Sequence, residues 1–566
     1  MVKHHVQIRG CDCVYTASKR GGARRRKKHA SSEGRIEQSP PNELLTGPAP
    51  VVSLATPGAG LLQRDEQLDF DMDFDFDPNF LGNSEPLTID NGSLPQPMFQ
   101  DTSEQEVENP VVRTYANDED ILGAYYVYIH PYFPVLPPPF LHQAIDKLET
   151  GLRGPNDILF HSKSNPQFQT ASPMTLAIST LLSLIPHPDD PNPASPESIL
   201  LRRNQAQVFA QMAIDSVELE NEMIESILDP GDALSSQHTH IYRTQIHPQV
   251  RLEAESTIAL LLLCTYEYSE RGNISKMRKR CGQALISAMD LGLHSKNTEV
   301  YDYAESDRRI WWMTAPSILL SDPRFTTPLP AFASDPDVWS VFLEAQRVIA
   351  TATQFVIDLE ASLKMESHNL TLWAQMAELE KTIEPLVQHA EKWSCSNVDG
   401  MDVSERVVAK SLRMMTRIKL NSSRFSSKVC MQSAFNIAQS FHALPFPQPF
   451  DPRNSSYRAE TKQLNSPPRM MPIFACCAMQ SSYAMIMLCH KTLAIKQASP
   501  FGDGLRKRTD KLLLQLHDGI KMILDALENY SMANEALTGM RDQIRMAVES
   551  VAATQEQSST LLPLGI

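Results

Sequence analysis

The sequence has no long hydrophobic run. Its longest strongly apolar stretch, IALLLLC at 258–264, is far shorter than the about 20 residues that a membrane-spanning helix needs. The first 28 residues also lack the apolar segment of a secretory signal peptide. We therefore expect a soluble intracellular protein with no membrane partner.

Cysteine is scarce as well, with nine residues in a chain of 566 and no pairing pattern typical of a disulfide framework. Most of these cysteines lie within apolar helical patterns, where a free cysteine behaves as a small hydrophobic residue. This distribution indicates a reducing compartment.

Catalytic and cofactor-binding signatures are also missing. The chain contains no G-x-x-x-x-G-K-[ST], G-x-G-x-x-G, H-E-x-x-H or G-x-S-x-G motif. Its sixteen histidines are scattered. The adjacent thiols of Cys476 and Cys477 would point about 100° apart on a helix, so they need further partners to hold a metal ion. We predict that the protein is not an enzyme.

The residues that are present favour helices. The hydrophobic fraction of 42% is sufficient for a large core, although forty prolines imply long irregular stretches. In 120–141, apolar residues follow one helical side until the prolines from Pro131 end the helix. Apolar residues fill nearly every position of 251–273, which is typical of a helix buried within a helical layer. A Gly-Asn turn then leads to a second helix that closes at Gly292, so the two helices are expected to form a hairpin.

Five further segments have helical patterns: 337–363, 403–420, 431–442, 473–496 and 506–550. In the last of them a seven-residue apolar repeat, Leu513, Leu516, Ile520, Ile523 and Leu527, spans two heptads, and this favours a core-facing helix over a coiled-coil seam. Long loops are predicted at 154–174, 185–198, 229–250 and 443–472. Because no stretch shows several alternating strands in series, the predicted fold class of the globular part is all-α.

Residues 31–110 are rich in proline and have no sustained period, so they are predicted to form a disordered linker. Within this linker, 65–81 includes LDFDMDFDFDPNFL, in which aspartates alternate with hydrophobic residues. The composition is typical of an activation segment, because the charges keep the aromatic groups solvated and available to a partner. The residues expected to make that contact are Phe70, Phe74, Phe76 and Phe80. An acidic spacer or an exposed strand is the alternative.

The first 28 residues are strongly basic, with nine lysines and arginines against a single acid, Asp12, whereas the whole chain has a formal net charge of −15. Such asymmetry predicts a tail that contacts a polyanion. Flexible basic side chains can neutralise DNA phosphates without reading bases. The residues assigned to this contact are Lys19, Arg20, Arg24, Arg25, Arg26, Lys27 and Lys28. A nuclear-import signal is an alternative for the same residues, and the two roles are compatible.

The stretch around Cys13 resembles the end of the binuclear zinc-cluster module of fungal transcription factors. It reads Cys13-Val14-Tyr15-Thr16 before the basic segment, as the sixth cysteine of that family precedes a Val/Tyr pair and a basic linker. The resemblance implies zinc as a cofactor and Cys13 as a remnant ligand. Val6 or His5 stands where the fifth cysteine is expected, and the first four would precede Met1. A truncated module of this kind is expected to bind no zinc, because its ligand set cannot close.

Three further segments resemble the regulatory region, or middle homology region, of the same family. They are YYVYIHPYFPVLPPPF at 125–140, RLEAESTIALLLLCTYEYSERGN with CGQALISAMDLGLH within 251–294, and AESDRRIWW at 304–312. The chain departs from the family pattern in two places. One is the truncated zinc-cluster module; the other is at RRIWWMT, which runs directly into APSILLSDPRFTTPLP where the family usually carries more helix and loop. A missing exon or a wrong start codon would account for both departures, and a genuine natural truncation is the alternative.

The resemblance implies four parts. They are the end of the zinc-cluster module with its basic linker at 1–30, the disordered linker at 31–110, the core of the regulatory region at 111–330, and its C-terminal helical part at 331–566. It implies a nuclear, DNA-binding regulator of RNA polymerase II transcription that binds promoter DNA and co-activators, often as a homodimer; a secondary-metabolite gene cluster is one candidate target. The alternative is a non-DNA-binding, all-α regulatory or scaffold protein that acts only through protein partners.

Overall fold

A computed structural model defines two compact units, divided between Phe70 and Asp71, and each is considered by itself. The residues that the structure describes are 5–8, 11–14, 110–140, 143–149, 172–227, 243–296, 301–315, 324–330, 332, 335–364, 370–392, 403–424, 427–451, 456–457, 466–472, 474–498 and 503–560.

The first unit contains an antiparallel hairpin of two four-residue strands, β1 (His5–Ile8) and β2 (Cys11–Val14). Its register pairs Val6 with Cys13 and Ile8 with Cys11. The β-branched residues of both strands favour extended backbone. The sequence analysis did not predict this hairpin, since strands of this length are too short to show a clear alternation.

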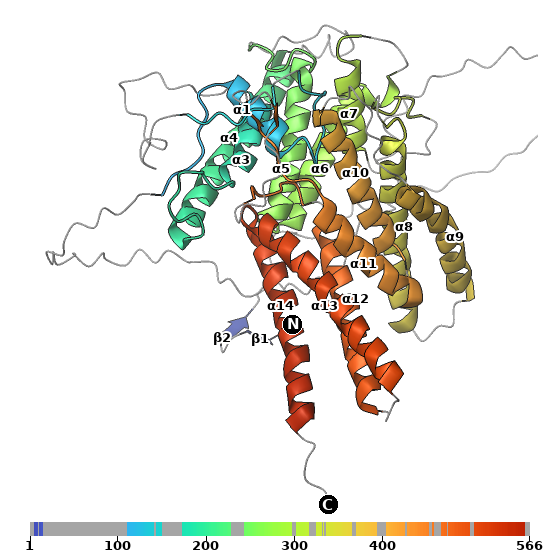
Figure 1. Ribbon diagram of the computed structural model, residues 1–566. Helices are drawn as coiled ribbons and strands as arrows, with labels where there is room; N and C mark the ends of the chain where they lie inside the picture. Colours follow the sequence, from blue (N-terminus) through green and yellow to red (C-terminus); the bar gives the residue numbers. More distant parts are fainter. Residues whose placement is uncertain are drawn as a thin grey trace, which may run out of the picture. The chain divides into compact units, whose positions relative to one another are not determined.

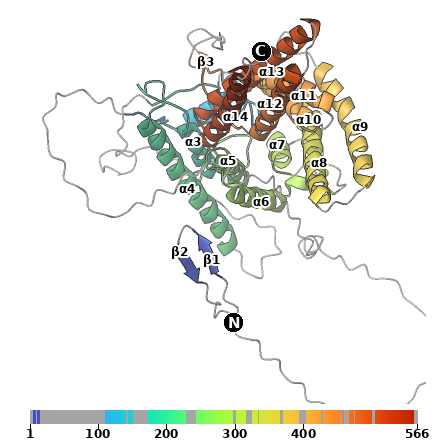
Figure 2. The same ribbon diagram turned by 90° about the horizontal axis from the view of Figure 1, so that it is seen from below.

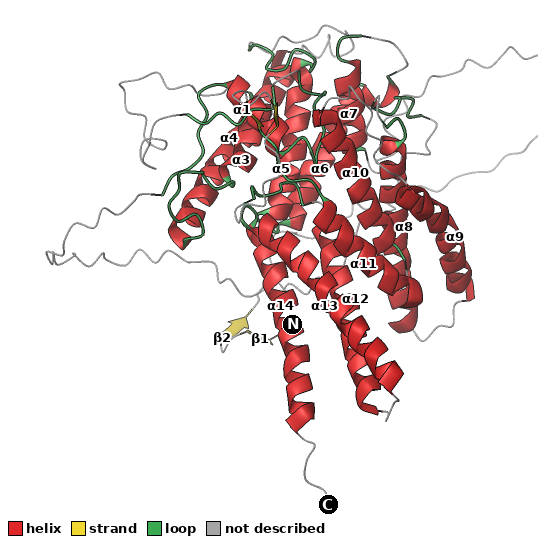
Figure 3. Ribbon diagram, in the orientation of Figure 1, coloured by secondary structure: helices red, strands yellow, loops and turns green. Residues whose placement is uncertain are grey.

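The second unit is mainly helical in its described part, so the predicted all-α fold class is confirmed (Figure 3). Its helices are α1 (Asp118–Tyr128), α3 (Pro173–Ser183), α4 (Pro196–Ile227), α5 (Glu255–Ser269), α6 (Ile274–Asp290), α7 (Ala304–Thr314), α8 (Val338–Lys364), α9 (Leu370–Lys392), α10 (Val403–Ser422), α11 (Ser427–Ala443), α12 (Ala475–Ala498), α13 (Asp503–Ser531) and α14 (Glu535–Thr560). The smaller elements are the 3-10 turns η1 (Leu252–Ala254) and η2 (Leu293–Ser295) and the paired strands β3 (Phe450–Asp451) and β4 (Ser456–Tyr457). No described helix has the length and apolar character needed to cross a membrane.

The helices pack in two connected groups (Figure 1, Figure 2). In the first group, α3 packs against α1, α4 and α5, and α5 also packs against α6. In the second, α10 packs against α8, α9 and α11, and α11 to α14 pack in succession. Contacts of α14 with α5 join the groups, and one hydrophobic cluster extends from Ile121 to Ile544 through both.

The predicted helix within 120–141 is confirmed as α1. Its N-cap Asn117 accepts a hydrogen bond from the backbone N–H of Asp120 at 2.8 Å, and the acids of its first turn lie at the positive end of the helix dipole. The helix ends at Tyr128, before Pro131, as predicted. Every residue from Ile121 to Tyr128 is buried, so α1 is surrounded by the core instead of burying one side only.

The predicted helical hairpin is confirmed as α5 and α6. Every residue from Ile258 to Leu263 is buried, as expected of a central helix. Gly292 has a φ of 67° directly after α6, the left-handed conformation that a glycine adopts at a helix end without steric cost. Helix α6 itself fully buries only Ala284 and Ala288, so it forms an outer layer on α5.

The five residues of the seven-residue repeat in α13 are all buried, which confirms a core-facing helix. The single helix predicted over 506–550 is wrong, because the chain turns between α13 and α14. The carbonyl of Tyr530 accepts hydrogen bonds from the N–H groups of Ala533 and Asn534 at 3.2 and 3.1 Å, and this ends α13. Helix α14 then packs back along α13. The turn contains neither proline nor glycine, so apolar periodicity alone did not reveal it.

Four helices, α3, α4, α7 and α9, were not singled out by sequence periodicity. Helix α9 contains Pro385 in its interior, a residue that usually breaks a helix. The predicted loop at 185–198 holds only to Ser195, because Pro196 starts α4, in a position where a proline's missing N–H carries no penalty.

Candidate functional site

Of the residues to which the sequence analysis assigned a function, the structure describes only Cys13. Cys13 lies in β2. The basic residues at 19–28 and the phenylalanines at 70–80 lie outside the described residues. Within the described ranges, no group of three or more His, Cys, Asp or Glu side chains is placed to hold a metal ion. The DNA, zinc and co-activator contacts therefore stay predictions.

A buried contact centred on Arg309 joins two of the segments that carry the sequence resemblance. Arg309 lies in α7 with its side chain fully buried. Its Nη1 donates to the carbonyl of Leu136 at 3.2 Å and, more weakly, to that of Pro134 at 3.4 Å. Its Nε donates to Glu305 one turn earlier, at 2.6 Å, and its guanidinium lies 5.2 Å from the centre of the Phe332 ring. The arginine thereby supplies donors to proline-rich backbone that has no helical hydrogen bonds of its own.

A second buried contact joins α7 to the start of the α5–α6 hairpin. Arg251 donates from Nε to Asp307 at 3.1 Å, and the Tyr301 hydroxyl donates to the other carboxylate oxygen at 2.6 Å. Asp307 is completely buried, and both of its carboxylate oxygens accept hydrogen bonds, as a buried polar group requires.

His247 extends the same network as a neutral side chain. Its Nδ1 accepts a hydrogen bond from the backbone N–H of Gln249 at 3.1 Å, so the ring proton belongs on Nε2, 3.0 Å from the Tyr126 hydroxyl. Tyr126 in turn donates to the carbonyl of Pro137 at 3.0 Å. Burial lowers the pKa of His247 to about 4 and also lowers the pKa of His130, whose ring lies 5.0 Å from that of Tyr126. His247 and His130 are therefore neutral at neutral pH, and the contact of His247 with Tyr126 helps to hold the proline-rich stretch in place.

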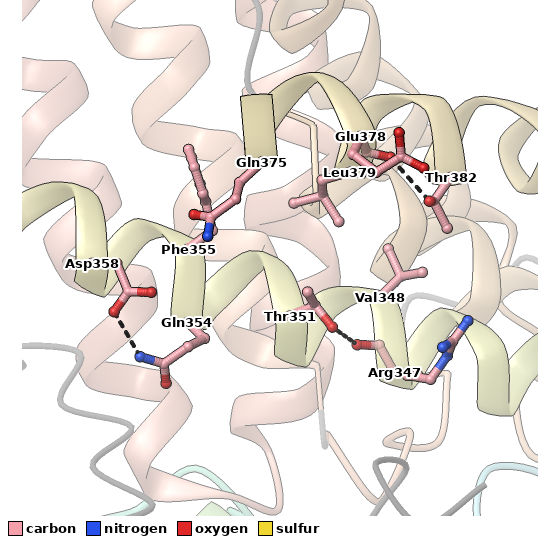
Figure 4. A pocket seen from close by; sticks show the side chains of 10 residues that line it. All are labelled: Arg347, Val348, Thr351, Gln354, Phe355, Asp358, Gln375, Glu378, Leu379 and Thr382. Atoms are coloured by element: carbon pink, nitrogen blue, oxygen red, sulfur yellow. Dashed lines mark hydrogen bonds between the residues drawn. The ribbon is translucent and has the colours of Figure 1, made fainter. Parts of the chain in front are cut away.

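One candidate binding site is a groove between α8 and α9, here called the α8–α9 groove (Figure 4). Its volume is about 410 Å³. Three buried apolar side chains form its floor: Val348 and Phe355 from α8 and Leu379 from α9. Figure 4 shows Val348 and Leu379 pointing toward each other across the groove. An apolar floor of this size with polar groups at the margin is typical of sites that bind small molecules or short peptide segments.

The margin of the α8–α9 groove is polar and mostly already hydrogen-bonded. Arg347 pairs with Glu344 on α8, and Gln354 donates to Asp358 at 3.0 Å. The hydroxyls of Thr351 and Thr382 donate to backbone carbonyls one turn earlier in their own helices, at 2.9 and 3.0 Å. These polar groups line the margin along which a ligand in the groove would lie.

Arg417 of α10 and Arg424, just after that helix, contact the C-terminal half of α9. Arg417 donates from Nε to the carbonyl of Ala390 at 2.8 Å, and Arg424 pairs with Glu384. A cation at the last carbonyls of a helix satisfies acceptors that have no partner within the helix and stabilises the negative end of its dipole. The opposite end of α9 carries Trp373, which is 65% exposed.

Sequence reasoning missed the α8–α9 groove because it missed α9. A usable signal was present: Leu372, Leu379, Ile383, Val387 and Ala390 recur at three-, four- and seven-residue spacing and are buried against α8 and α10. Pro385 lies within the same stretch and obscured the pattern.

Comparison with protein-family models, curated proteins and solved structures gives no match for this chain.

Proposed function

We propose that this protein is a non-enzymatic, DNA-binding regulator of RNA polymerase II transcription related to fungal zinc-cluster factors. Its helical second unit is the regulatory region, and its basic N-terminal segment contacts DNA in the nucleus. The phenylalanines of the acidic segment recruit co-activators. The α8–α9 groove is the place where a small effector or partner segment would bind the regulatory region.

One observation carries the proposal. The segment at 125–140 lies far before the other two in the sequence, yet Arg309 donates to its backbone and Arg251 donates to Asp307, so the three segments form one hydrogen-bonded unit. Segments that a family shares are expected to contact one another in the folded protein. If the likeness of these stretches were accidental, there would be no reason for them to lie in contact. This convergence supports the resemblance as a whole.

The residues present do not fit a binuclear zinc cluster. Cys13 is the only counterpart of a family ligand, and the residue paired with it across the hairpin is Val6, whose side chain cannot bind zinc. We therefore assign no zinc-dependent step to this chain and attribute DNA contact to the basic residues alone.

The test is a titration of the full chain against labelled duplex DNA at several salt concentrations. If the seven basic residues between Lys19 and Lys28 all contact phosphates, the logarithm of the binding constant should fall with the logarithm of salt with a slope of about −6. Replacing Arg24, Arg25 and Arg26 by serine should reduce the size of that slope by about 3.

A matched control removes the same charge from the helical unit. Arg506, Lys507 and Arg508 are exposed at the start of α13, and their replacement by serine should leave the slope unchanged. Equal losses in both variants would mean that net charge alone governs binding, which contradicts the assignment. If the wild-type chain does not bind DNA even at low salt, the proposal fails, and a scaffold acting only through protein partners becomes the better interpretation.

A further inference from the structure

The α5–α6 hairpin places two cysteines against each other. Cys264 of α5 and Cys281 of α6 are separated by 17 positions in the sequence, and their sulfur atoms lie 2.8 Å apart. Both are free thiols. A disulfide bond requires about 2.05 Å between sulfurs, so small side-chain rotations would bring this pair to bonding distance.

The two thiols differ in their surroundings. Cys281 is exposed to solvent, whereas Cys264 is only partly exposed. The hydrogen bond between the thiols lowers the pKa of Cys281 and raises that of Cys264, with the Cys264 proton directed at the Cys281 sulfur.

We propose that Cys264 and Cys281 are a redox modification site that forms a reversible disulfide on exposure to a hydroperoxide. The Cys281 thiolate attacks one peroxide oxygen and the O–O bond breaks, which gives a sulfenic acid on Cys281 and, with one proton, releases water or an alcohol. The sulfur of Cys264 then attacks the Cys281 sulfur. The Cys264 proton and the hydroxyl group leave as a second water, and the S–S bond forms. Both electrons come from the two thiols, and the hydroperoxide is the species reduced.

The structural consequence follows from the different burial of the two helices. Helix α5 is anchored in the core, whereas α6 fully buries only Ala284 and Ala288 and exposes Ile286 to 61%. Covalent linkage at Cys264 and Cys281 joins the outer helix to the central one and removes open states of the hairpin. The redox state of the pair therefore controls how firmly α6 is held. This site does not depend on the function proposed above.

Tryptic peptide mapping of the full chain tests the proposal directly. Cleavage at the lysines and arginines isolates each cysteine in a peptide of its own, 252–271 and 281–296. After treatment with equimolar hydrogen peroxide, we expect a linked pair of these peptides that has lost two hydrogens. Reduction by thioredoxin or dithiothreitol should restore both free peptides. If peroxide instead oxidises other cysteines while this pair stays reduced, the proposal is overturned.

Single variants assign the order of attack. In Cys264→Ser, the sulfenic acid on Cys281 should persist and be captured by dimedone. In Cys281→Ser, Cys264 should remain reduced at the same peroxide dose. Dimedone capture at Cys264 in the second variant, without capture at Cys281 in the first, would refute the assigned roles. Circular dichroism of each variant confirms that the helices are retained.

Cys476→Ser is the matched control. Cys476 is also exposed, and the hydrogen bond from the Cys477 thiol, together with the nearby Lys419 ammonium, lowers the pKa of Cys476 to about 7. It is therefore a competing thiolate with no resolving partner across a helical hairpin. The yield of the linked peptides should be unchanged in this variant. A loss of the link in Cys476→Ser would show that oxidation reaches the pair only through Cys476, contrary to the proposal.

Discussion

Replacing Arg309 by methionine should destabilise the helical unit more than any surface substitution in α7. The change removes the donor to the carbonyls of Pro134 and Leu136 and leaves both buried oxygens without their arginine partner. A buried polar group that loses its partner costs about 1 to 3 kcal/mol. The two bonds are long, at 3.4 and 3.2 Å, so values near the lower end apply.

The ion pair with Glu305 adds little to this loss. Glu305 is 32% exposed, so water screens the pair and replaces the arginine when it is absent. Methionine also keeps much of the apolar volume of the arginine stem, which limits cavity formation. Together these terms predict a destabilisation of about 2 kcal/mol for Arg309→Met.

The measurement is thermal unfolding followed by far-UV circular dichroism at a fixed heating rate. A loss of 1 kcal/mol lowers Tm by roughly 2 to 4 °C in a domain of 150 to 250 residues and by less in a larger one, so we expect a decrease of about 3 °C. Arg308→Met is the control on the same helix: Arg308 is 24% exposed and lies 3.8 Å from Glu305, so its loss should cost less than about 0.5 kcal/mol. Equal shifts in both variants would refute the reasoning, because they would show that the buried donors to the proline-rich stretch contribute nothing beyond a surface charge.

Three further predictions concern other parts of the chain. Gly292→Ala should destabilise the protein by about 1 kcal/mol because φ is 67° at that position, whereas Gly282→Ala, inside α6 with nothing within 4 Å of an added Cβ, should stabilise it by about 0.5 to 1 kcal/mol; urea unfolding measures both. The pKa of His247 is lowered from 6.5 to about 4 in the folded state, so the unfolded state binds a proton first as pH falls below 6.5. The free energy of unfolding should therefore be highest above pH 6.5 and should fall by up to about 3 kcal/mol as pH drops toward 4. His247→Gln should therefore flatten the dependence of Tm on pH in that window. A fusion of residues 60–100 to a heterologous DNA-binding domain should activate a reporter gene, and most of the activity should disappear when alanine replaces Phe70, Phe74, Phe76 and Phe80.

Each of these predictions has a contrary outcome. Unchanged or increased stability of Gly292→Ala would show that the helix end does not require a left-handed residue, and destabilisation by Gly282→Ala would contradict the prediction for α6. An unchanged pH slope in His247→Gln would assign acid sensitivity to other groups, such as His130, whose pKa burial also lowers. If the alanine fusion keeps full reporter activity, the phenylalanines do not contribute to activation, and 65–81 is an acidic spacer. The substitution leaves every aspartate in place, so this outcome would not reflect a change of charge.

The sequence by itself determined the fold class and most helices, because apolar periodicity records which side of a helix faces the core. It placed α5 as a buried central helix, and it identified Gly292 as a helix end since few other residues adopt a positive φ there. The burial of the seven-residue repeat in α13 also followed from local spacing. All of these are properties of neighbouring residues along the chain.

The tertiary structure decided everything that depends on distant residues. Helix α9 forms despite Pro385 because its apolar side packs against α8 and α10, and because Arg417 satisfies its last carbonyls. The break between α13 and α14 exists because α14 can bury its side on α13. The contact of Arg309 with Leu136, across 173 positions, has no local signal at all. Likewise, the 17-residue spacing of Cys264 and Cys281 does not by itself indicate a contact. Their sulfur atoms lie close together only because the hairpin packs α6 against α5.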